Sequence, residues 1–362
     1  MVNKHAGISL LLSFFLVYPL SLFASENPVV SMTMLPTLAY RADTDVWMAR
    51  MPASLSLAIP SANKGNVRGE VVLKASTPVT ITSLDDVVHK AYLKAKFPSF
   101  RLTMGKTRLS WGDGRVFNAA DVLYGSSDTA LDFTQTELRN MTTWMVSINY
   151  PIDFFSFAEA VMMPSDTTDP TDMTFGGRFY GTIQDIKVEG GYATKRESGS
   201  RVHKPYVSFQ GSFGPDWYLS SSLTIPVTGD IAQSTLTSWL ASAGLFQYVQ
   251  LENDRSMTLR LEFLLRPFGD WDLASALDNK NCALLLYPEL NYAISPSLAL
   301  SFQSILSPLD LSSKSTIGFS WNVFEGFSVL GYGSVTSGEA GDVFSWNAAD
   351  SFSLSVGTSW VF

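Results

Sequence analysis

Few residues in this chain have the chemistry of a catalytic or metal-binding group. The 362 residues include three histidines and one cysteine, Cys282. His89 falls on the apolar side of an alternating segment, and His203 lies between Arg201 and Lys204 in a basic stretch that we interpret as a loop. An esterase or protease needs a base beside a nucleophile, and neither histidine lies in such a motif. We expect no enzyme activity, metal site or cofactor, and a single cysteine cannot form an internal disulfide.

The charges with the most suggestive spacing lie between Arg108 and Asp121, in the stretch RLSWGDGRVFNAAD. Gly112 and Gly114 permit the backbone angles of a sharp fold, and Asn118 can begin a helical turn. The charged residues of the stretch can cross-link it to a surrounding wall. Two placements are open: a cap on the rim of a barrel, or a constriction inside its lumen. The candidate constriction residues are Arg108, Trp111, Asp113, Arg115, Asn118 and Asp121.

A second set of charges lies opposite the apolar side of the alternating segments. Where the phase is clear this side carries mostly cations, although the net charge of the chain is -8. We expect most acids in loops such as 166–172 and 270–278. A basic wall around a water-filled lumen focuses anions, unless its groups pair with lumen acids or lie at the rim. The candidate lumen charges are Arg68, Lys74, Lys90, Lys94, Lys96, Arg101, Arg178, Lys187, Arg260 and Glu262.

The elements that would carry these charges are β-strands, because apolar and polar residues alternate with a period of two. The clearest hairpin joins 88–97 to 100–109 across Pro98 and Ser99. The final segment, 352–362, places its large apolar residues on one face and serines on the other. Two early segments, 32–40 and 47–59, decide between sixteen and eighteen strands. The count is even in both cases.

Composition indicates a membrane protein that crosses with strands. The chain is 46% hydrophobic and 16% charged, whereas soluble domains carry roughly 25% charged residues. No apolar run of eighteen residues follows the N-terminal region, which disfavours membrane helices. A chain that is apolar overall but nowhere continuously so is typical of a transmembrane barrel. We weigh this against a secreted β-sandwich, whose strands would need polar outer faces. The acidic net charge offers no footprint for nucleic acid.

The N-terminus predicts export. Lys4 and His5 precede an apolar run over residues 8–23, and we place cleavage after Ala24. The alternative is an uncleaved membrane anchor. The domains are then a signal peptide at 1–24 and a barrel at 25–362.

Connections between the strands fall into two length classes, as in outer-membrane barrels with short periplasmic turns and longer external loops. We predict short turns at Pro98, Pro151, Gln184, Gly214, Asn253, Ser295 and Glu325. We predict longer loops around 109–141, 164–174, 196–205, 227–245, 267–283, 307–314 and 336–351.

Two stretches resemble known outer-membrane proteins. The aromatic C-terminus with Trp360 and Phe362 resembles the insertion signal of bacterial outer-membrane barrels, which implies recognition by the barrel-assembly machinery. The stretch from Trp111 to Asp121 resembles the W-G-x-G…F-N-x-x-D segment of porin-like barrels, including those of spirochaetes such as treponemes. Those families often have proline after the asparagine, where this chain has Ala119.

We therefore predict an all-β, single-domain transmembrane antiparallel up-and-down β-barrel of 16–18 strands in the bacterial outer membrane. The expected function is passive diffusion of small hydrophilic solutes with a weak preference for anions. The alternative is a surface-exposed barrel whose loops bind external ligands with little conductance. The expected partners are outer-membrane lipid, the assembly machinery and the solutes; no nucleic acid is expected, and the sequence leaves the substrate and oligomeric state open.

Overall fold

A computed structural model describes residues 28–59, 66–77, 83–125, 141–165, 169–197, 199–272, 282–346 and 351–362. The predicted signal peptide, residues 1–24, lies outside these ranges and stays a prediction. Within them, no helix is long and apolar enough to cross a membrane.

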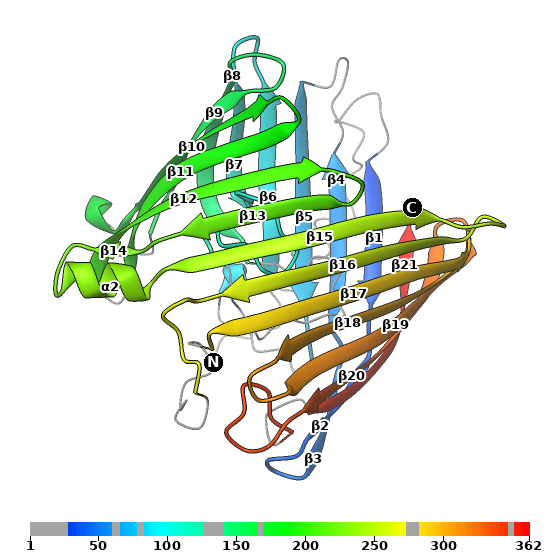
Figure 1. The fold of residues 1–362 in the computed structure, drawn as a ribbon. Helices are drawn as coiled ribbons and strands as arrows, with labels where there is room; N and C mark the ends of the chain where they lie inside the picture. Colours follow the sequence, from blue (N-terminus) through cyan, green and yellow to red (C-terminus); the bar gives the residue numbers. More distant parts are fainter. Residues whose placement is uncertain are drawn as a thin grey trace, which may run out of the picture.

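Most of the described chain is β-strand, arranged as one antiparallel sheet (Figure 1). Within the described ranges, three short helical segments lie outside the strands: η2 (Leu84–Asp86), η3 (Pro170–Asp172) and α2 (Ile231–Thr237). The strands are β1 (Val29–Met34), β2 (Thr37–Arg41), β3 (Val46–Arg50), β4 (Ala53–Ile59), β5 (Val67–Ala75), β6 (Val88–Lys96), β7 (Arg101–Thr107), β8 (Thr143–Pro151), β9 (Phe157–Met163), β10 (Thr174–Ile183), β11 (Ile186–Glu197), β12 (Ser200–Ser212), β13 (Asp216–Ser222), β14 (Ile225–Pro226), β15 (Leu240–Gln250), β16 (Ser256–Leu265), β17 (Leu284–Ser295), β18 (Leu298–Ser307), β19 (Ser312–Phe324), β20 (Phe327–Ser337) and β21 (Phe352–Val361).

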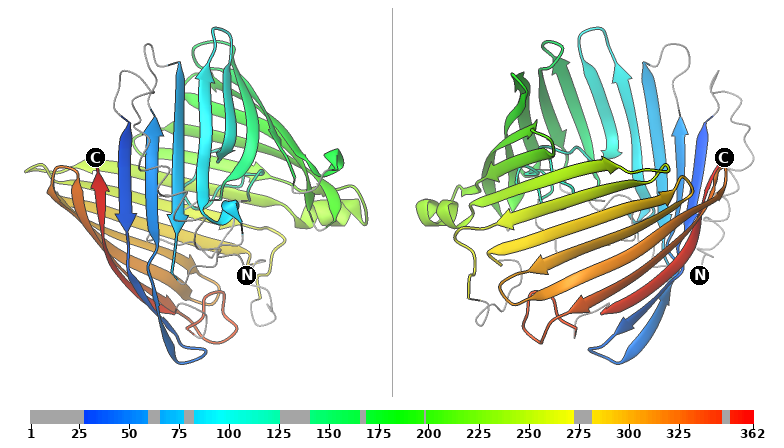
Figure 2. Two further views of the ribbon diagram at one scale, coloured as in Figure 1. Left: turned by 180° about the vertical axis from the view of Figure 1, so that it is seen from behind. Right: turned by 45° about the vertical axis from the view of Figure 1, so that its right-hand side comes forward.

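The sheet closes into a barrel of eighteen strands. The pairs β1 and β2, β3 and β4, and β13 and β14 are each two halves of one interrupted barrel strand. The last strand, β21, pairs with β20 on one side and with β1 and β2 on the other, and Figure 2 shows it beside β1. The predicted antiparallel barrel with an even strand number is confirmed, and both early segments form strands.

Prolines interrupt the first two barrel strands. Pro36 separates β1 from β2, and Pro52 separates β3 from β4. A proline has no N–H to donate to a sheet ladder, but its carbonyl still pairs: Leu35 N–H donates to the Pro52 carbonyl at 3.0 Å, and Val356 N–H donates to the Pro36 carbonyl at 3.1 Å. Hydrogen bonding between neighbouring strands therefore continues past both prolines, and the barrel stays closed.

The two faces of the wall differ as alternation predicts. On β16 the side chains of Leu259 and Leu261 are exposed on the outer face, whereas Glu262 is fully buried on the inner face. On β10 Phe175 and Phe179 lie on the exposed outer face, and Arg178 points inward to Glu159 on the neighbouring strand. The outer face is thus apolar for lipid, and the inner face carries the polar groups.

The connections differ at the two ends of the barrel. One end, here called the turn end, carries the C-terminus and short turns at 97–100, 152–156, 184–185, 213–215, 251–255, 296–297 and 325–326. The opposite loop end carries the longer connections. Two predicted long loops are wrong: β11 and β12 extend through 196–205, leaving 198–199 as the connection, and 307–314 contracts to 308–311.

The error at 196–205 arises because charged residues there are paired in an extended hairpin. Lys204 Nζ donates to Glu197 Oε1 at 2.8 Å, and Arg196 pairs with Asp172. Strands that continue beyond the membrane can carry such charges. His203 consequently lies in β12, beside the Tyr192 hydroxyl, and not in a loop.

Candidate functional site

The connection after β7 folds back against the inner face of the barrel. We call its described part, residues 108–125, the inner loop. Trp111 and Phe117 are fully buried, and Asn118 and Asp121 are 2% and 1% exposed. The loop contacts inward-facing residues of β9, β11, β15, β16 and β17, so it lies inside the barrel along one side of the wall. Of the two predicted placements, this position matches the one inside the lumen.

Two wall glutamates hold the start of the inner loop. Trp111 Nε1 donates to Glu159 Oε2 at 3.2 Å, and Gly112 N–H donates to Glu189 Oε1 at 2.9 Å. Arg178 bridges the same two carboxylates at 2.7 and 3.2 Å. A carboxylate that accepts several hydrogen bonds and faces a cation tolerates burial. Arg178 is therefore a structural bridge behind the loop.

Glu262 holds the middle of the inner loop through backbone hydrogen bonds. Its carboxylate accepts the N–H of Arg115 at 2.7 Å and those of Val116 and Phe117 at 2.8 Å each. The Arg115 side chain reaches the wall separately, at 2.5 Å from Glu289 Oε1. Arg260 lies 3.2 Å from Glu262 and 3.4 Å from Glu289. This cluster of two acids and two cations pins the loop to β16 and β17.

Other predicted loop residues bind within the loop itself. Asn118 Nδ2 donates to the Trp111 carbonyl at 2.8 Å, and Asn118 Oδ1 accepts the Ala120 N–H at 3.0 Å. Arg108 forms an ion pair with Asp121. Arg108 Nη1 also donates to the Met141 carbonyl at 3.3 Å, next to the start of β8.

The glycines permit the fold of the loop around Asp113. Gly112 and Gly114 have φ angles of 66° and 128°, in the region that favours glycine. A Cβ on Gly112 would lie 2.3 Å from the Ala120 Cβ. Asp113, between them, makes no hydrogen bond or ion pair to any described residue and borders a small cavity beside Arg260.

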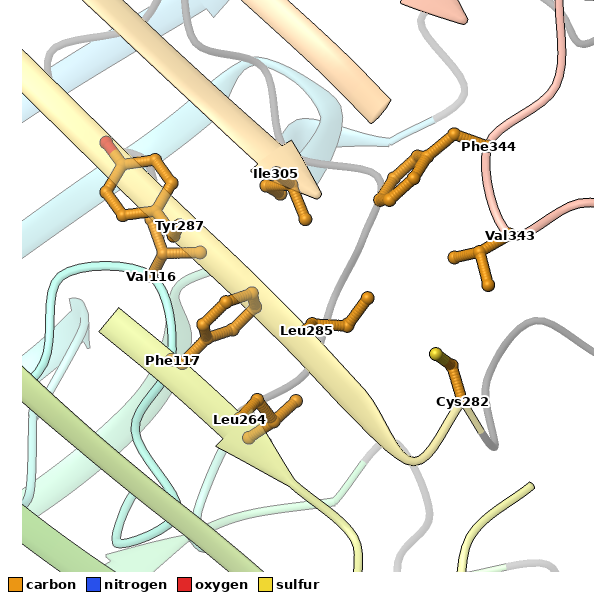
Figure 3. Packing of buried hydrophobic residues seen from close by; sticks show 9 residues of the cluster. All are labelled: Val116, Phe117, Leu264, Cys282, Leu285, Tyr287, Ile305, Val343 and Phe344. Carbon is orange, nitrogen blue, oxygen red and sulfur yellow. The ribbon is translucent and has the colours of Figure 1, made fainter. Parts of the chain in front are cut away.

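An apolar cluster covers the loop-end half of the same side (Figure 3). Val116 and Phe117 of the inner loop pack toward β16–β18, and Val343 and Phe344 reach the cluster from the loop after β20. Cys282, 1% exposed, lies in the same cluster. The remaining members are Leu264, Leu285, Tyr287 and Ile305. Two connections from the loop end therefore fold inward and seal this side of the lumen.

Asp310 fixes the second inward connection. Its carboxylate accepts the Val343 N–H at 2.7 Å and the Ser312 hydroxyl at 2.8 Å, and that hydroxyl accepts the Phe344 N–H at 3.0 Å. Burial alone would raise the pKa of Asp310. The hydrogen bonds from Val343, Ser307 and Ser312 stabilise the carboxylate and hold its pKa below the usual value.

The inner face of β5–β7 carries the basic residues, away from the loop-binding glutamates. Directly paired residues of neighbouring strands share a face, and the register links Glu159 to Asn149, Asn149 to Arg101, and Arg101 to Lys96. Arg68 is opposite Lys94 in the same way. We call this face, with Arg68, Lys74, Lys90, Lys94, Lys96 and Arg101, the basic strip.

Like charges lie directly opposite each other in the basic strip, which is unfavourable without an anion nearby. Among the described residues, Arg68, Lys96 and Arg101 make no ion pair, and Lys94 lies over the Tyr92 ring. The nearest acid on the strip, Glu70, accepts the Tyr92 hydroxyl at 2.7 Å. Arg178 and Arg260, in contrast, pair with wall acids, and Lys187 donates to Gln210 at 3.0 Å.

A third sector of the inner face carries hydroxyl groups. Thr316 and Ser334 are 2.5 Å apart on β19 and β20, and Thr37 and Ser355 are 2.8 Å apart on β2 and β21. These groups bond to each other and carry no charge. The lumen therefore has a glutamate sector that binds the inner loop, a basic strip and a hydroxyl sector.

The main residue that the sequence did not identify is Glu159 on β9, which binds both Trp111 and Arg178. Glu189, Glu262 and Glu289 lie with Glu159 on the inner wall, on the strand faces that alternation assigns to the lumen. No group of three histidine, cysteine or acidic side chains within the described ranges has the geometry of a metal site. At the C-terminus Trp360 stacks on Phe327 and Phe362 N–H donates to the Val30 carbonyl at 2.8 Å.

No protein-family model matches this chain, and no curated protein matches it in sequence. Solved structures match its fold. Pseudomonas aeruginosa OccK11 (OpdR) is 10% identical, with 92% of this chain and 96% of that chain covered and a TM-score of 0.55. OpdL of the same organism is 9% identical, with 93% and 98% covered and a TM-score of 0.57. Acinetobacter baumannii OccAB4 is 11% identical, with 95% and 100% covered and a TM-score of 0.54. At these identities the likeness shows a shared barrel fold.

Proposed function

We propose that the chain is a porin-like diffusion channel for small hydrophilic solutes in the bacterial outer membrane. The closed barrel of eighteen strands supports this, because barrels of sixteen or more strands leave an aqueous channel, whereas about eight strands are filled by side chains. The turn end then faces the periplasm and the loop end faces outside. The observation that carries the proposal is the position of the inner loop, whose described residues lie along one side of the lumen, on strands β9–β17 and away from the basic strip.

The inner loop sets the width of this channel. Its contacts with Glu159, Glu189, Glu262 and Glu289 fix it on β9–β17, so solutes pass between the loop, the basic strip and the hydroxyl sector. Because these four glutamates are engaged by the loop or by arginines, they contribute little free negative charge to the path. Within the described residues, Arg68, Lys96 and Arg101 of the strip make no ion pair, and their charges set the field in the remaining space.

This arrangement favours a weak preference for anions. Low-dielectric walls focus the field of the basic strip into the lumen. The field should fade as salt rises to 1 M, where the screening length is about 3 Å. The reversal potential across a salt gradient in a planar bilayer tests the proposal, and we expect a shift toward the anion equilibrium potential.

The matched variant is Lys94→Glu with Lys96→Glu, which reverses two charges of the strip. It should move the reversal potential toward cations. Arg255→Glu, which changes charge in a turn at 251–255, serves as the control and should leave selectivity near wild type. Cation preference of the wild-type channel would refute the anion-selective strip.

A further inference from the structure

A hollow lies on the outer face of the barrel at its turn end. It lies between the turn 152–156 and strands β10 and β11, and it has a volume of about 510 Å³. Phe179 and Gly181 line it from β10, on the face opposite Arg178 and Tyr180. Its other lining residues are Asp153, Phe154, Phe155, Ser156, Thr182, Ile183 and Val188. The hollow is therefore a feature of the lipid-facing surface, separate from the lumen.

A glycine packed against Phe179 and two projecting aromatic side chains border the hollow. Gly181 has no side chain, and a Cβ there would lie 3.2 Å from Phe179 Cε1. Phe154 and Phe155 extend from the short turn with 98% and 70% of their surfaces exposed. Two adjacent phenylalanines so exposed in a short turn are unfavourable in water and indicate an apolar neighbour.

The surrounding surface and charge identify that neighbour. The hollow is continuous with the outer apolar face, where Phe179 and Ile183 are exposed to the acyl-chain region. Asp153 stands at its edge. The Phe155 N–H and Ser156 stabilise its carboxylate and lower the pKa of Asp153, so it is charged at neutral pH. A carboxylate at headgroup level attracts an ammonium group and repels an anionic headgroup.

We propose that this hollow holds an acyl chain of a phospholipid of the periplasmic leaflet whose headgroup carries an ammonium group. The chain fills the hollow beside Phe155 and Phe179, and the headgroup ammonium faces Asp153. This binding site is independent of conduction through the lumen.

The test measures lipid retained by the purified full chain after transfer from vesicles of equal phosphatidylethanolamine and phosphatidylglycerol, by native mass spectrometry. Wild type should retain phosphatidylethanolamine in preference to phosphatidylglycerol. Gly181→Leu fills the hollow and should lower retention about tenfold, the effect of excluding about two methylene groups. Asp153→Asn should keep the lipid but lose the headgroup preference.

The control is Gly333→Leu, another outward glycine, around which no atom lies within 4 Å of an added Cβ. It should retain lipid as wild type does. Phe154→Ala, at an exposed position that cannot disturb folding, should also weaken retention if Gly181→Leu fails to fold. Equal retention by wild type and both hollow variants would overturn the proposal. The proposal would also be overturned if two barrels associated without lipid and Gly181→Leu abolished that association, because the hollow would then bind a second copy of the chain.

Discussion

Replacing Glu262 by glutamine should release the inner loop from the wall. Oε2 of Glu262 accepts the N–H groups of Val116 and Phe117, and Oε1 accepts the N–H of Arg115 and a bond from Arg260. Glutamine has nearly the same volume, but one of its two terminal groups is an NH₂ donor. In either orientation two donors lose their acceptor.

The size of the effect follows from those two donors. If the amide nitrogen replaces Oε2, the loop loses two hydrogen bonds, from Val116 and Phe117; if it replaces Oε1, the loop loses the one from Arg115 and the wall loses the one from Arg260. Hydrogen bonds to a charged acceptor are worth about 1.5–3 kcal/mol each, so the loop loses at least roughly 1.5–3 kcal/mol. Because every 1.4 kcal/mol is a factor of ten, the ratio of docked to released loop should fall at least about tenfold. A released loop makes the path through the lumen variable in width.

Single-channel recording in planar bilayers measures this directly. Glu262→Gln should show larger mean conductance and more open-channel noise than wild type. The control is Glu70→Gln, because Glu70 also faces the lumen but accepts the Tyr92 hydroxyl and contacts no described residue of the inner loop. Glu262→Gln channels with wild-type conductance and noise would refute the role assigned to this carboxylate.

The other predictions concern the second loop, the topology and insertion. The pKa of Asp310 is lowered in the folded protein, so the charged carboxylate stabilises the second inward connection fully above about pH 4, the unfolded pKa, and this stabilisation is lost as pH falls through the folded pKa. Pepsin should then cleave 338–346 faster at the lower pH. Asp310→Asn should remove this pH dependence of cleavage. A tag within 338–346 should be accessible on intact cells and a tag at Asn253 should not; a surface-exposed Asn253 would reverse the topology. Trp360→Asp or removal of Phe362 should lower insertion, since a charge in the lipid-facing wall costs roughly 2–4 kcal/mol at mid-depth; normal heat-modifiable barrel levels would contradict this.

The wall was predictable because one face of each strand must meet lipid and the other water. Alternation alone assigns Arg101, Lys94 and Arg260 to the face opposite the apolar residues. Register with neighbouring strands then placed them on one surface. The two early strands were harder to identify because Pro36 and Pro52 interrupt them.

The inner loop was only partly predictable. Its glycines and asparagine are local signals, and Gly112, Gly114 and Asn118 behave as their chemistry requires. Its anchoring depends on backbone N–H groups that meet Glu262, 145 to 147 residues away in sequence. Every residue except proline has a backbone N–H, so the sequence does not show which of these groups bind Glu262. The ion pair between Arg108 and Asp121 was equally hard to predict, because each side chain could instead have paired with a charged residue of the barrel wall.

The most direct test of the central claim is the conductance of the purified full chain in planar bilayers. A water-filled barrel narrowed by a fixed loop should insert in discrete steps of stable, ohmic conductance that rises with salt. Folded, membrane-inserted barrels without such steps would contradict the channel and favour a surface barrel that acts through its loops.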